Sequence, residues 1–327
     1  MAWPCRWGAC SSPSPRPWPP ISSPCGLSGI TAASGSGGFR VSDAGFPKSI
    51  LERLGLKPRK SLGQHFLIHA AVARRIALAL EAGAGDPVVE IGGGLGALTF
   101  SLADLGCRVE VLEIDPALAA YLESELFPSH PRVRILRQDA LTYDFAAAAR
   151  QAGRPLFVVG NLPYQITSPL LFRLAAAKKA LARAVLMLQA EVGRRLLASP
   201  GVKDYGILTV AAQYHFNMAR LFSLGPGHFF PPPKVDSVVL SFTPIRPQPE
   251  AVDEELFLRV VKTAFGQRRK TLKNTLAAQA APLGLTANQV LAALTALDID
   301  PGRRGETLSV SQFVRLSNHL ARLRTEG

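Results

Sequence analysis

Apolar residues follow two alternating patterns along the middle of the chain, and each pattern predicts a different element. Short apolar runs bounded by turn residues are typical of buried strands, whereas apolar positions three and four apart indicate helices. The predicted strands cover residues 88–91, 109–114, 133–136, 156–160, 184–188, 220–224 and 238–243. Helical patterns, such as those at 95–105 and 116–126, separate the first five strands. We therefore expect an α/β fold whose parallel sheet is covered on both faces.

The last two predicted strands differ from the others because only a Pro- and Gly-rich connector joins them. A connector of this kind predicts an antiparallel hairpin at the edge of the sheet. Seven strands ending in such a hairpin resemble the Rossmann-like sheet of class I methyltransferases, which depend on S-adenosylmethionine. A nicotinamide-binding sheet is instead expected to stay parallel.

The pattern changes near both ends of the chain, which predicts three regions. Residues 1–46 are rich in Pro, Ser and Gly, so we expect a disordered leader. Such a leader lacks the apolar core of a signal peptide; a transit peptide or a translation start upstream of the native one remains open. Residues 47–249 form the predicted methyltransferase domain. Beyond them, helical patterns at 253–280, 286–297 and 309–324 predict a small all-helical domain over residues 250–327.

Charge and cysteine content narrow the classes of function. Lys and Arg number 37 against 24 Asp and Glu, which gives a net charge of +13. This excess indicates a polyanionic partner, with an anionic membrane surface second and a general drift toward arginine as the bland alternative. No apolar run reaches the roughly 18 residues of a membrane span. Three of the four cysteines lie in the leader and Cys107 stands alone, so we expect no disulfide framework and a reducing compartment, the cytoplasm.

A glycine-rich turn follows the first predicted strand and opens a helix, in the sequence EIGGGLGAL at residues 90–98. Glycines let a backbone approach a ligand closely, and a helix N-terminus favours negative charge. Gly92, Gly94 and Gly96 fit the G-x-G-x-G pattern of methyltransferases. Gly92, Gly94 and Ala97 fit the dinucleotide pattern equally well, so the turn alone leaves both cofactors open.

Acidic residues at the ends of the next two strands extend this cofactor pocket. Glu113, followed by Ile114, ends the second strand and can accept hydrogen bonds from both ribose hydroxyls of either cofactor. Asp139, followed by Ala140, comes after the third strand and can accept a hydrogen bond from the adenine amine of the cofactor. The alternative for each acid is a solvated charge at a strand end.

The fourth strand ends in a motif that favours an amine-bearing substrate. The Asn161 side-chain oxygen and the Leu162 main-chain carbonyl can both accept N–H bonds from one amino group, which would expose its lone pair. Pro163 fixes the backbone, and Tyr164 offers a stacking face for a base. A plain turn with a buried tyrosine is the alternative. Residues 228–235 (HFFPPPKV) supply a second aromatic, and we expect Phe229 rather than Phe230 to sandwich a flipped base with Tyr164.

Together these motifs resemble the bacterial small-subunit ribosomal RNA adenine dimethyltransferase family, from about residue 58 to residue 320. Further matching stretches are KSLGQHFL at 60–67, PPPKVDS at 231–237, FGQRRKTL at 265–272 and GETLSV at 305–310. The resemblance implies dimethylation of two adjacent adenines in the 3′-terminal hairpin of small-subunit RNA, within immature 30S subunits. It also implies cofactor contacts at Gln64, His65 and Leu67. The full predicted cofactor set is Gln64, His65, Leu67, Gly92, Gly94, Glu113, Ile114, Asp139, Ala140 and Asn161.

Two residues depart from the family pattern. His65 stands where the family usually carries Asn, which puts the geometry of that contact in doubt. Gly93 stands where the family often has Pro, so we expect a slightly looser turn.

The predicted helical domain carries a candidate RNA surface. On a helix over 253–280, Lys262, Arg269 and Lys273 share one stripe, with Arg268 and Lys270 beside it. Val261, Phe265, Leu272 and Leu276 would form the neighbouring buried stripe. A solvated basic face is the alternative.

Three rivals remain. A nicotinamide-dependent oxidoreductase fits the glycine turn and Glu113 but leaves residues 161–164 unexplained. A non-catalytic RNA-binding protein conflicts with the intact motifs, and a large-subunit ribosomal RNA methyltransferase usually has Ile where Leu162 stands. No metal-binding motif is present and a sulfonium is already electrophilic, so we expect an enzyme without a metal. We also expect a monomer.

Overall fold

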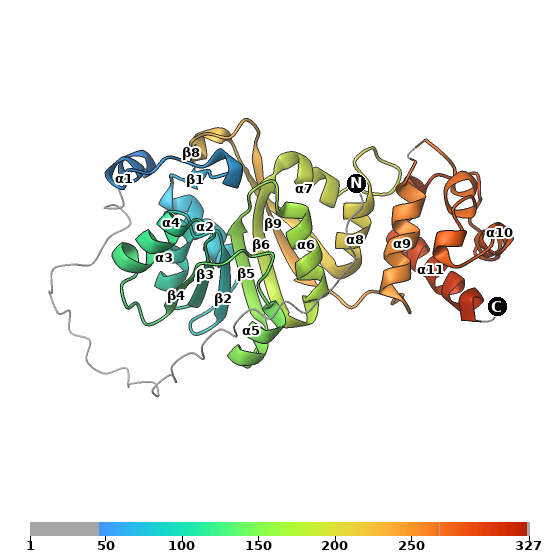
Figure 1. Ribbon diagram of the computed structural model, residues 1–327, viewed down its shortest axis with the longest axis horizontal. Helices are drawn as coiled ribbons and strands as arrows, with labels where there is room; N and C mark the ends of the chain where they lie inside the picture. The colour runs from blue at the N-terminus through green and yellow to red at the C-terminus, as the bar shows by residue number, and fades with distance from the viewer. Residues whose placement is uncertain (1–45, 268, 326–327) are drawn as a thin grey trace. The chain divides into compact units, whose positions relative to one another are not determined.

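The computed structural model describes residues 46–267 and 269–325 (Figure 1). Residues 1–45 of the predicted leader, and Arg268 of the predicted RNA surface, lie outside the described residues. The described chain divides into two compact units. Unit 1 holds the described residues up to Ile166 with Lys179–Met187 and Leu224–Asp236, and unit 2 holds Thr167–Lys178, Leu188–Ser223 and the described residues from Ser237 onward. The boundary predicted at residue 249 stays a prediction.

Parallel strands form the centre of unit 1. They are β2 (Pro87–Ile91), β3 (Arg108–Leu112), β4 (Val133–Leu136), β5 (Leu156–Asn161) and β6 (Leu181–Gln189). β2 pairs with β3 on one side and with β5 on the other, so Glu90 lies opposite both Val111 and Val159. The strand order of the whole sheet is β4-β3-β2-β5-β6-β9-β7. The order reverses between β2 and β5, and ligands of such sheets bind outside the carboxyl ends of the strands at that point.

Helices accompany these strands (Figure 1). They are α2 (Ala70–Ala79), α3 (Ala97–Asp104), α4 (Pro116–Tyr121) and α5 (Phe145–Ala152). Two of them begin at aspartates that satisfy free backbone N–H groups: Asp115 accepts from the Ala117 N–H and Asp144 from the Ala147 N–H. α3 and α4 begin directly after the glycine turn and after Glu113, so both helix starts lie at the same edge of the sheet.

A two-stranded sheet joins segments of unit 1 that are far apart in the sequence. β1 (Phe66–Leu67) and β8 (Phe229–Phe230) pair antiparallel, with Leu67 opposite Phe229 and Phe66 opposite Phe230. The Pro- and Gly-rich connector before the last large strand contains β8. α1 (Pro47–Arg53) lies nearby, because its Leu51 packs with Phe66 in a small apolar cluster.

Unit 2 contains the remaining helices and the edge strands. They are α6 (Thr167–Ala176), α7 (Ala190–Leu196), α8 (Ile207–His215), β7 (Phe216–Leu224), β9 (Ser237–Pro244), α9 (Glu254–Phe265), α10 (Ala287–Ala296) and α11 (Val310–Thr325). The Ile245 N–H donates to the His215 carbonyl, and the Ser241 hydroxyl donates to the Ala219 carbonyl. Partners therefore run in opposite directions along β7 and β9, as predicted for an antiparallel edge pair.

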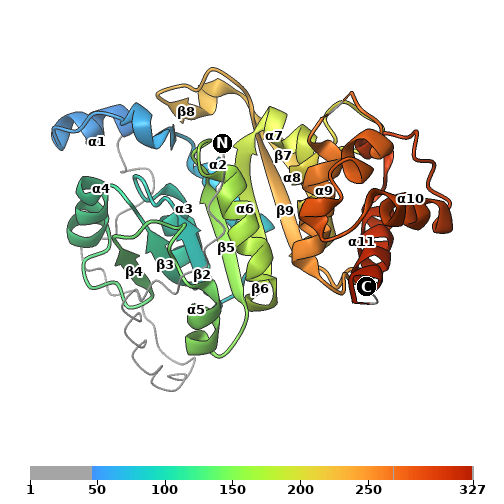
Figure 2. The ribbon, with the colours of Figure 1, turned by 45° about the vertical axis from the view of Figure 1, so that its right-hand side comes forward.

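The C-terminal helices of unit 2 lie side by side around one apolar core (Figure 2). Leu256, Phe257 and Val260 of α9 are fully buried there, together with Val210 of α8 and Phe313 of α11. Short 3-10 turns lie at Lys60–Leu62, Lys178–Ala180, Pro226–His228, Ala281–Leu283 and Gly305–Thr307, and single π-helical turns lie at Leu122–Leu126 and Lys273–Ala277.

The single helix predicted over 253–280 is wrong. α9 ends at Phe265, and helical structure resumes only at Lys273. In between, the Leu272 N–H donates to the Arg303 carbonyl and the Lys273 N–H donates to the Pro301 carbonyl. The backbone there bonds to a distant loop rather than to its own preceding turn, so Lys262 and Lys273 do not share one helical stripe.

Within the described residues, no helix combines the length and the apolar character needed to cross a bilayer. Cys107, the one cysteine of this part of the chain, is a buried free thiol. The same residues contain no group of three or more His, Cys, Asp or Glu side chains placed to hold a metal ion.

Candidate active site

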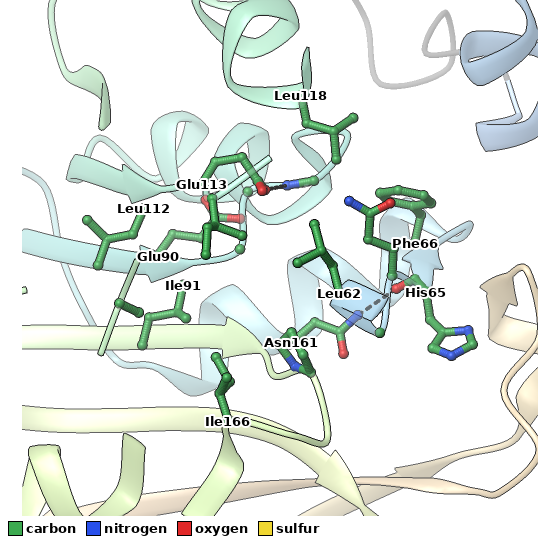
Figure 3. Close-up of a pocket in the computed structure, with 18 of the residues that line it drawn as sticks. Leu62, His65, Phe66, Glu90, Ile91, Leu112, Glu113, Leu118, Asn161 and Ile166 are labelled. Atoms are coloured by element: carbon green, nitrogen blue, oxygen red, sulfur yellow. Dashed lines mark hydrogen bonds between the residues drawn. The ribbon is translucent and has the colours of Figure 1, made fainter. Parts of the chain in front are cut away.

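A cavity lies at the carboxyl ends of β2, β3 and β5, within unit 1 (Figure 3). Its volume is about 1060 Å³ including the open mouth. Every residue of the predicted cofactor set lines it: Gln64, His65, Leu67, Gly92, Gly94, Glu113, Ile114, Asp139, Ala140 and Asn161. The structure therefore brings together residues from five separate stretches of sequence, although their binding roles stay predictions.

The glycine turn approaches its neighbours too closely for side chains. Gly92 and Gly94 adopt φ values of 76° and 55°, a left-handed region that favours glycine. A Cβ atom on Gly94 would lie 3.2 Å from the Phe66 ring. A Cβ on Gly93 would lie 2.4 Å from Val111, so the position is closely packed. The looser turn expected from Gly93 stays a prediction.

Glu113 lies at the end of β3 and is 4% exposed. Its Oε2 accepts the Gly94 N–H at 2.9 Å and its Oε1 accepts the Asp115 N–H at 2.8 Å. Burial raises the pKa of Glu113, and these two backbone hydrogen bonds oppose that rise. Each carboxylate oxygen has a further lone pair, so the pair can accept two ligand hydroxyls while the side chain holds the glycine turn.

Glu90 is a cavity residue to which the sequence analysis gave no role. It is 1% exposed, and its Oε2 accepts the Thr99 hydroxyl at 2.6 Å. Burial raises the pKa of Glu90 to about 8, with the Thr99 hydrogen bond opposing this shift and the Glu113 charge adding to it. The signal that could have revealed it is its position between Val89 and Ile91 inside an apolar run, because both faces of a central parallel strand are covered.

The charge of the cavity fits S-adenosylmethionine. Glu113 and Asp139 line it, and the lining residues of the described chain include no Lys or Arg. Glu90 also lines it, but with a pKa of about 8 it does not supply the charge of an ordinary carboxylate at neutral pH. An acidic lining suits a ligand that carries a sulfonium and an ammonium group. The glycine turn leaves backbone space, Glu113 supplies acceptors for a ribose, and Ile114 is 48% exposed as an apolar surface for a flat ring. The residues present therefore fit this cofactor.

Gln64 holds the segment before β1 in place. Its Nε2 donates to Asp115 Oδ2 at 2.9 Å, and its Oε1 accepts the Arg59 backbone N–H at 2.8 Å. Arg59 Nε also lies 3.4 Å from the same Asp115 oxygen. The Gln64 amide thus fastens the 59–67 segment to the start of α4, next to Glu113.

Asn161 ends β5 with a defined amide orientation. Its Nδ2 donates to the main-chain oxygen of His65 at 2.7 Å (Figure 3). A carbonyl oxygen only accepts, so the NH₂ group must face His65 and Oδ1 must face the other way. Gly63 approaches the same motif, because a Cβ there would lie 3.3 Å from the Pro163 Cβ. The Asn161 oxygen is therefore presented as an acceptor, as the sequence motif requires.

The other predicted substrate residues are placed differently. Pro163 lines the cavity, whereas the Leu162 side chain is buried and its N–H donates to the Met187 carbonyl. The Tyr164 ring stacks on the His65 ring, with centroids 6.0 Å apart and planes 27° apart. Phe229 is 4% exposed in β8 and does not line the cavity. The sandwich of Tyr164 and Phe229 around a base stays a prediction.

The basic residues lie in unit 2. Lys262, Arg269, Lys270 and Lys273 are all exposed, on α9 and on the segment that follows its end. The apolar residues predicted beside them are buried as expected at Val261, Leu272 and Leu276, and Phe265 is partly buried. Exposure fits contact with RNA phosphates, which stays a prediction.

The glycine turn at the switch point and the strand-end carboxylate fit either cofactor, and the antiparallel pair of β7 and β9 favours the S-adenosylmethionine-dependent class I methyltransferases over nicotinamide-binding proteins. The family model for ribosomal RNA adenine dimethylase matches residues 55–322. The chain belongs to this family, which confirms the predicted enzyme class, cofactor and fold class.

Known relatives agree with this assignment. The chain is 45% identical over 268 residues to ribosomal RNA small subunit methyltransferase A of Geobacter sulfurreducens, covering 81% of this chain and 96% of the relative. The corresponding protein of Pseudomonas aeruginosa is 44% identical, with coverage of 82% and 96%. A dimethyladenosine transferase from Plasmodium falciparum superposes with a TM-score of 0.67 at 25% identity, over 77% of this chain and 96% of that one. The 23S rRNA methyltransferase ErmE superposes with a TM-score of 0.59 at 28% identity, over 78% and 99%.

Proposed function

We propose that this chain dimethylates N6 of two adjacent adenines in the 3′-terminal hairpin of small-subunit ribosomal RNA. Its substrate is the immature 30S subunit, and it acts as a monomer in the cytoplasm during subunit biogenesis. The observation that carries the proposal is the orientation of Asn161, whose oxygen is turned away from the His65 carbonyl and is available as an acceptor. The match to small subunit methyltransferase A relatives over most of both chains supports the choice of RNA.

When bound, S-adenosylmethionine supplies an electrophilic methyl group on its sulfonium. Asn161 Oδ1 and the Leu162 carbonyl accept the two N–H groups of the target amine and draw its lone pair out of conjugation with the ring. Tyr164 stacks on the base and holds it in place. The chain contributes chiefly by positioning the amine, an effect that lowers the barrier by about 7 kcal/mol or more in favourable cases. The N6 proton becomes acidic only after transfer, so water can accept it and no dedicated base is required.

RNA docking falls to the basic residues of unit 2 in this proposal. Lys262, Arg269, Lys270 and Lys273, with Arg268, would contact phosphates on the subunit. Their exposure and the net charge of +13 support this role. Contacts of this type make binding strongly dependent on salt.

The test is methyl transfer to purified immature small subunits, with dimethyladenosine measured by mass spectrometry of digested RNA. We expect Asn161→Ala to lose about 100-fold or more in rate, by analogy with removal of one polar group that acts in a transition state. Asn217→Ala, at an exposed position on β7, is the matched control and should keep wild-type activity. Large-subunit RNA in a parallel assay distinguishes the rival substrate. Equal activity of Asn161→Ala and wild type would remove Asn161 from the mechanism.

A further inference from the structure

His65 joins three segments of unit 1 that are distant in sequence. Its main-chain oxygen accepts from Asn161 Nδ2 at 2.7 Å. Its ring Nδ1 lies 2.7 Å from the Pro231 carbonyl oxygen, and the same ring stacks on Tyr164. Figure 3 shows the ring on the far side of the Asn161 contact from Glu113. The His65 side chain therefore faces the residues proposed to hold the target base.

The Pro231 contact determines which nitrogen of the ring carries hydrogen. A carbonyl oxygen can only accept, so Nδ1 must donate to it. In the neutral ring this fixes the tautomer, with the lone pair on Nε2. The 2.7 Å separation is typical of a short, well-formed hydrogen bond.

The sequence around Pro231 explains why a side chain is needed here. The β1–β8 pairing runs through Phe66 opposite Phe230. The next three residues, 231–233, are prolines, which lack an N–H and cannot continue a strand ladder. Pro231 has no N–H to donate to the His65 main-chain oxygen, which accepts from Asn161 instead. The Pro231 carbonyl can still accept, and the His65 ring N–H donates to it. This hydrogen bond holds the start of the proline segment against β1.

We propose that His65 is a positioning residue for the target adenine: its Nδ1–H to Pro231 bond and its stacking on Tyr164 hold the base-binding segments in register. The inference rests on the proposed function. It also changes the role implied for the His65 side chain, which serves the base side of the site rather than the cofactor side. The cofactor groups Glu113 and Asp139 make their own hydrogen bonds to backbone N–H groups and do not depend on the ring.

Two substitutions separate the two contacts of the ring. Asn places an N–H donor on Cγ, as imidazole Nδ1 does, so His65→Asn can keep the bond to Pro231 but loses the stacking. His65→Phe keeps a ring against Tyr164 but loses the donor, and His65→Ala loses both. His319→Phe, at a half-buried histidine on α11, is the matched control.

The first measurement is steady-state kinetics on purified immature small subunits, beside calorimetric binding of S-adenosylmethionine alone. Loss of one such hydrogen bond corresponds to about a 5- to 10-fold effect. We expect KM for the subunits to rise by about that factor in His65→Phe and by more in His65→Ala, while cofactor Kd changes less than about twofold. KM for the subunits in His65→Asn should stay close to the wild-type value. A tenfold weaker cofactor Kd in His65→Phe, or wild-type KM in that variant, would overturn the proposal.

The second measurement needs no activity. Amide hydrogen exchange of residues 228–230 and 234–236 should be faster in His65→Phe and His65→Ala than in wild type, and close to wild type in His65→Asn and His319→Phe. If wild type fails to methylate small subunits, the proposed function fails, and hydrogen exchange still tests the hydrogen bond from His65 to Pro231. Unchanged exchange in His65→Phe would contradict a positioning role for that hydrogen bond even if methylation is confirmed.

Discussion

Unit 1 buries acidic side chains and unit 2 buries a histidine. Burial disfavours the charged form of each group, so it shifts their pKa values in opposite directions. In unit 1 the cavity encloses Glu90 and Glu113, whose pKa values burial raises. In unit 2, His215 is 6% exposed beside Lys178, and burial followed by the Lys178 charge lowers its pKa to about 4. The acids suit a cationic cofactor, whereas the exposed bases of unit 2 suit an anionic partner. The comparison supports the proposal that the cofactor and the RNA are recognised by charge in separate parts of the chain.

The largest expected effect concerns Glu113. Glu113→Ala removes the proposed acceptor for the cofactor and leaves the Gly94 and Asp115 N–H groups without their partner. We expect S-adenosylmethionine binding to weaken by about 100-fold, because a lost acceptor adds to the cost of unpaired buried donors. Calorimetry measures this, with the exposed Glu123→Ala as control. Unchanged affinity would mean that the acidic cavity does not bind the cofactor.

Glu90 tests the pH dependence of unit 1. Its folded-state pKa of about 8 lies above the ordinary value of 4.5, so the folded chain holds the proton more tightly than the unfolded chain. This contribution is fully present below pH 4.5 and is lost as pH rises through about 8. Glu90→Gln keeps an acceptor for Thr99 and removes the ionisation. We expect its free energy of unfolding to exceed that of wild type by about 2 to 3 kcal/mol at pH 7 relative to pH 5. Denaturant titrations at the two pH values measure this difference. An equal dependence of the free energy of unfolding on pH in the variant and in wild type would contradict it.

His215 tests the opposite sign in unit 2. Its Nδ1 has no hydrogen-bond partner among the described residues, and Lys178, which lies over the Tyr214 ring and 3.6 Å from Glu254, is the charged neighbour. The neutral ring is favoured in the folded state, so stability is lost as pH falls from about 6.5 through 4. We expect His215→Met to reduce this acid-induced loss by about 1 kcal/mol. The same denaturant titrations, run at pH 7 and about pH 5.5, check it. A shift in the same direction as Glu90→Gln would break the comparison.

The smallest expected effect concerns the exposed bases. Lys270→Ala and Lys273→Ala should each weaken binding to small subunits about threefold and reduce the slope of log K against log salt by about 1. Filter binding over a range of salt concentrations measures both. Lys48→Ala, an exposed lysine of α1 in unit 1, should leave the slope unchanged. Equal effects of Lys48 and Lys270 would show that unit 2 is not the preferred RNA surface.

Local sequence determined most of the sheet and the position of the site. The predicted strand 133–136 coincides with β4, and the predicted start of the strand at 156 coincides with that of β5. Both follow from short apolar runs between turns, which depend on neighbours in the chain. The glycine turn, Glu113 and Asn161 could be assigned to one cavity because parallel strands place their carboxyl ends at the same edge.

Only the tertiary structure decided the features that depend on distant partners. The predicted helix 253–280 fails because residues 272 and 273 bond to the loop at 301–303, which no local pattern reveals. Glu90 is a buried acid because β2 lies between β3 and β5, and the Asn161 oxygen faces away from the His65 carbonyl because that carbonyl accepts from the amide nitrogen. The bond from His65 to Pro231 spans 166 positions of the chain. Sequence patterns report the burial and turning of short segments, whereas hydrogen bonds between remote segments exist only after the sheet has brought their ends together.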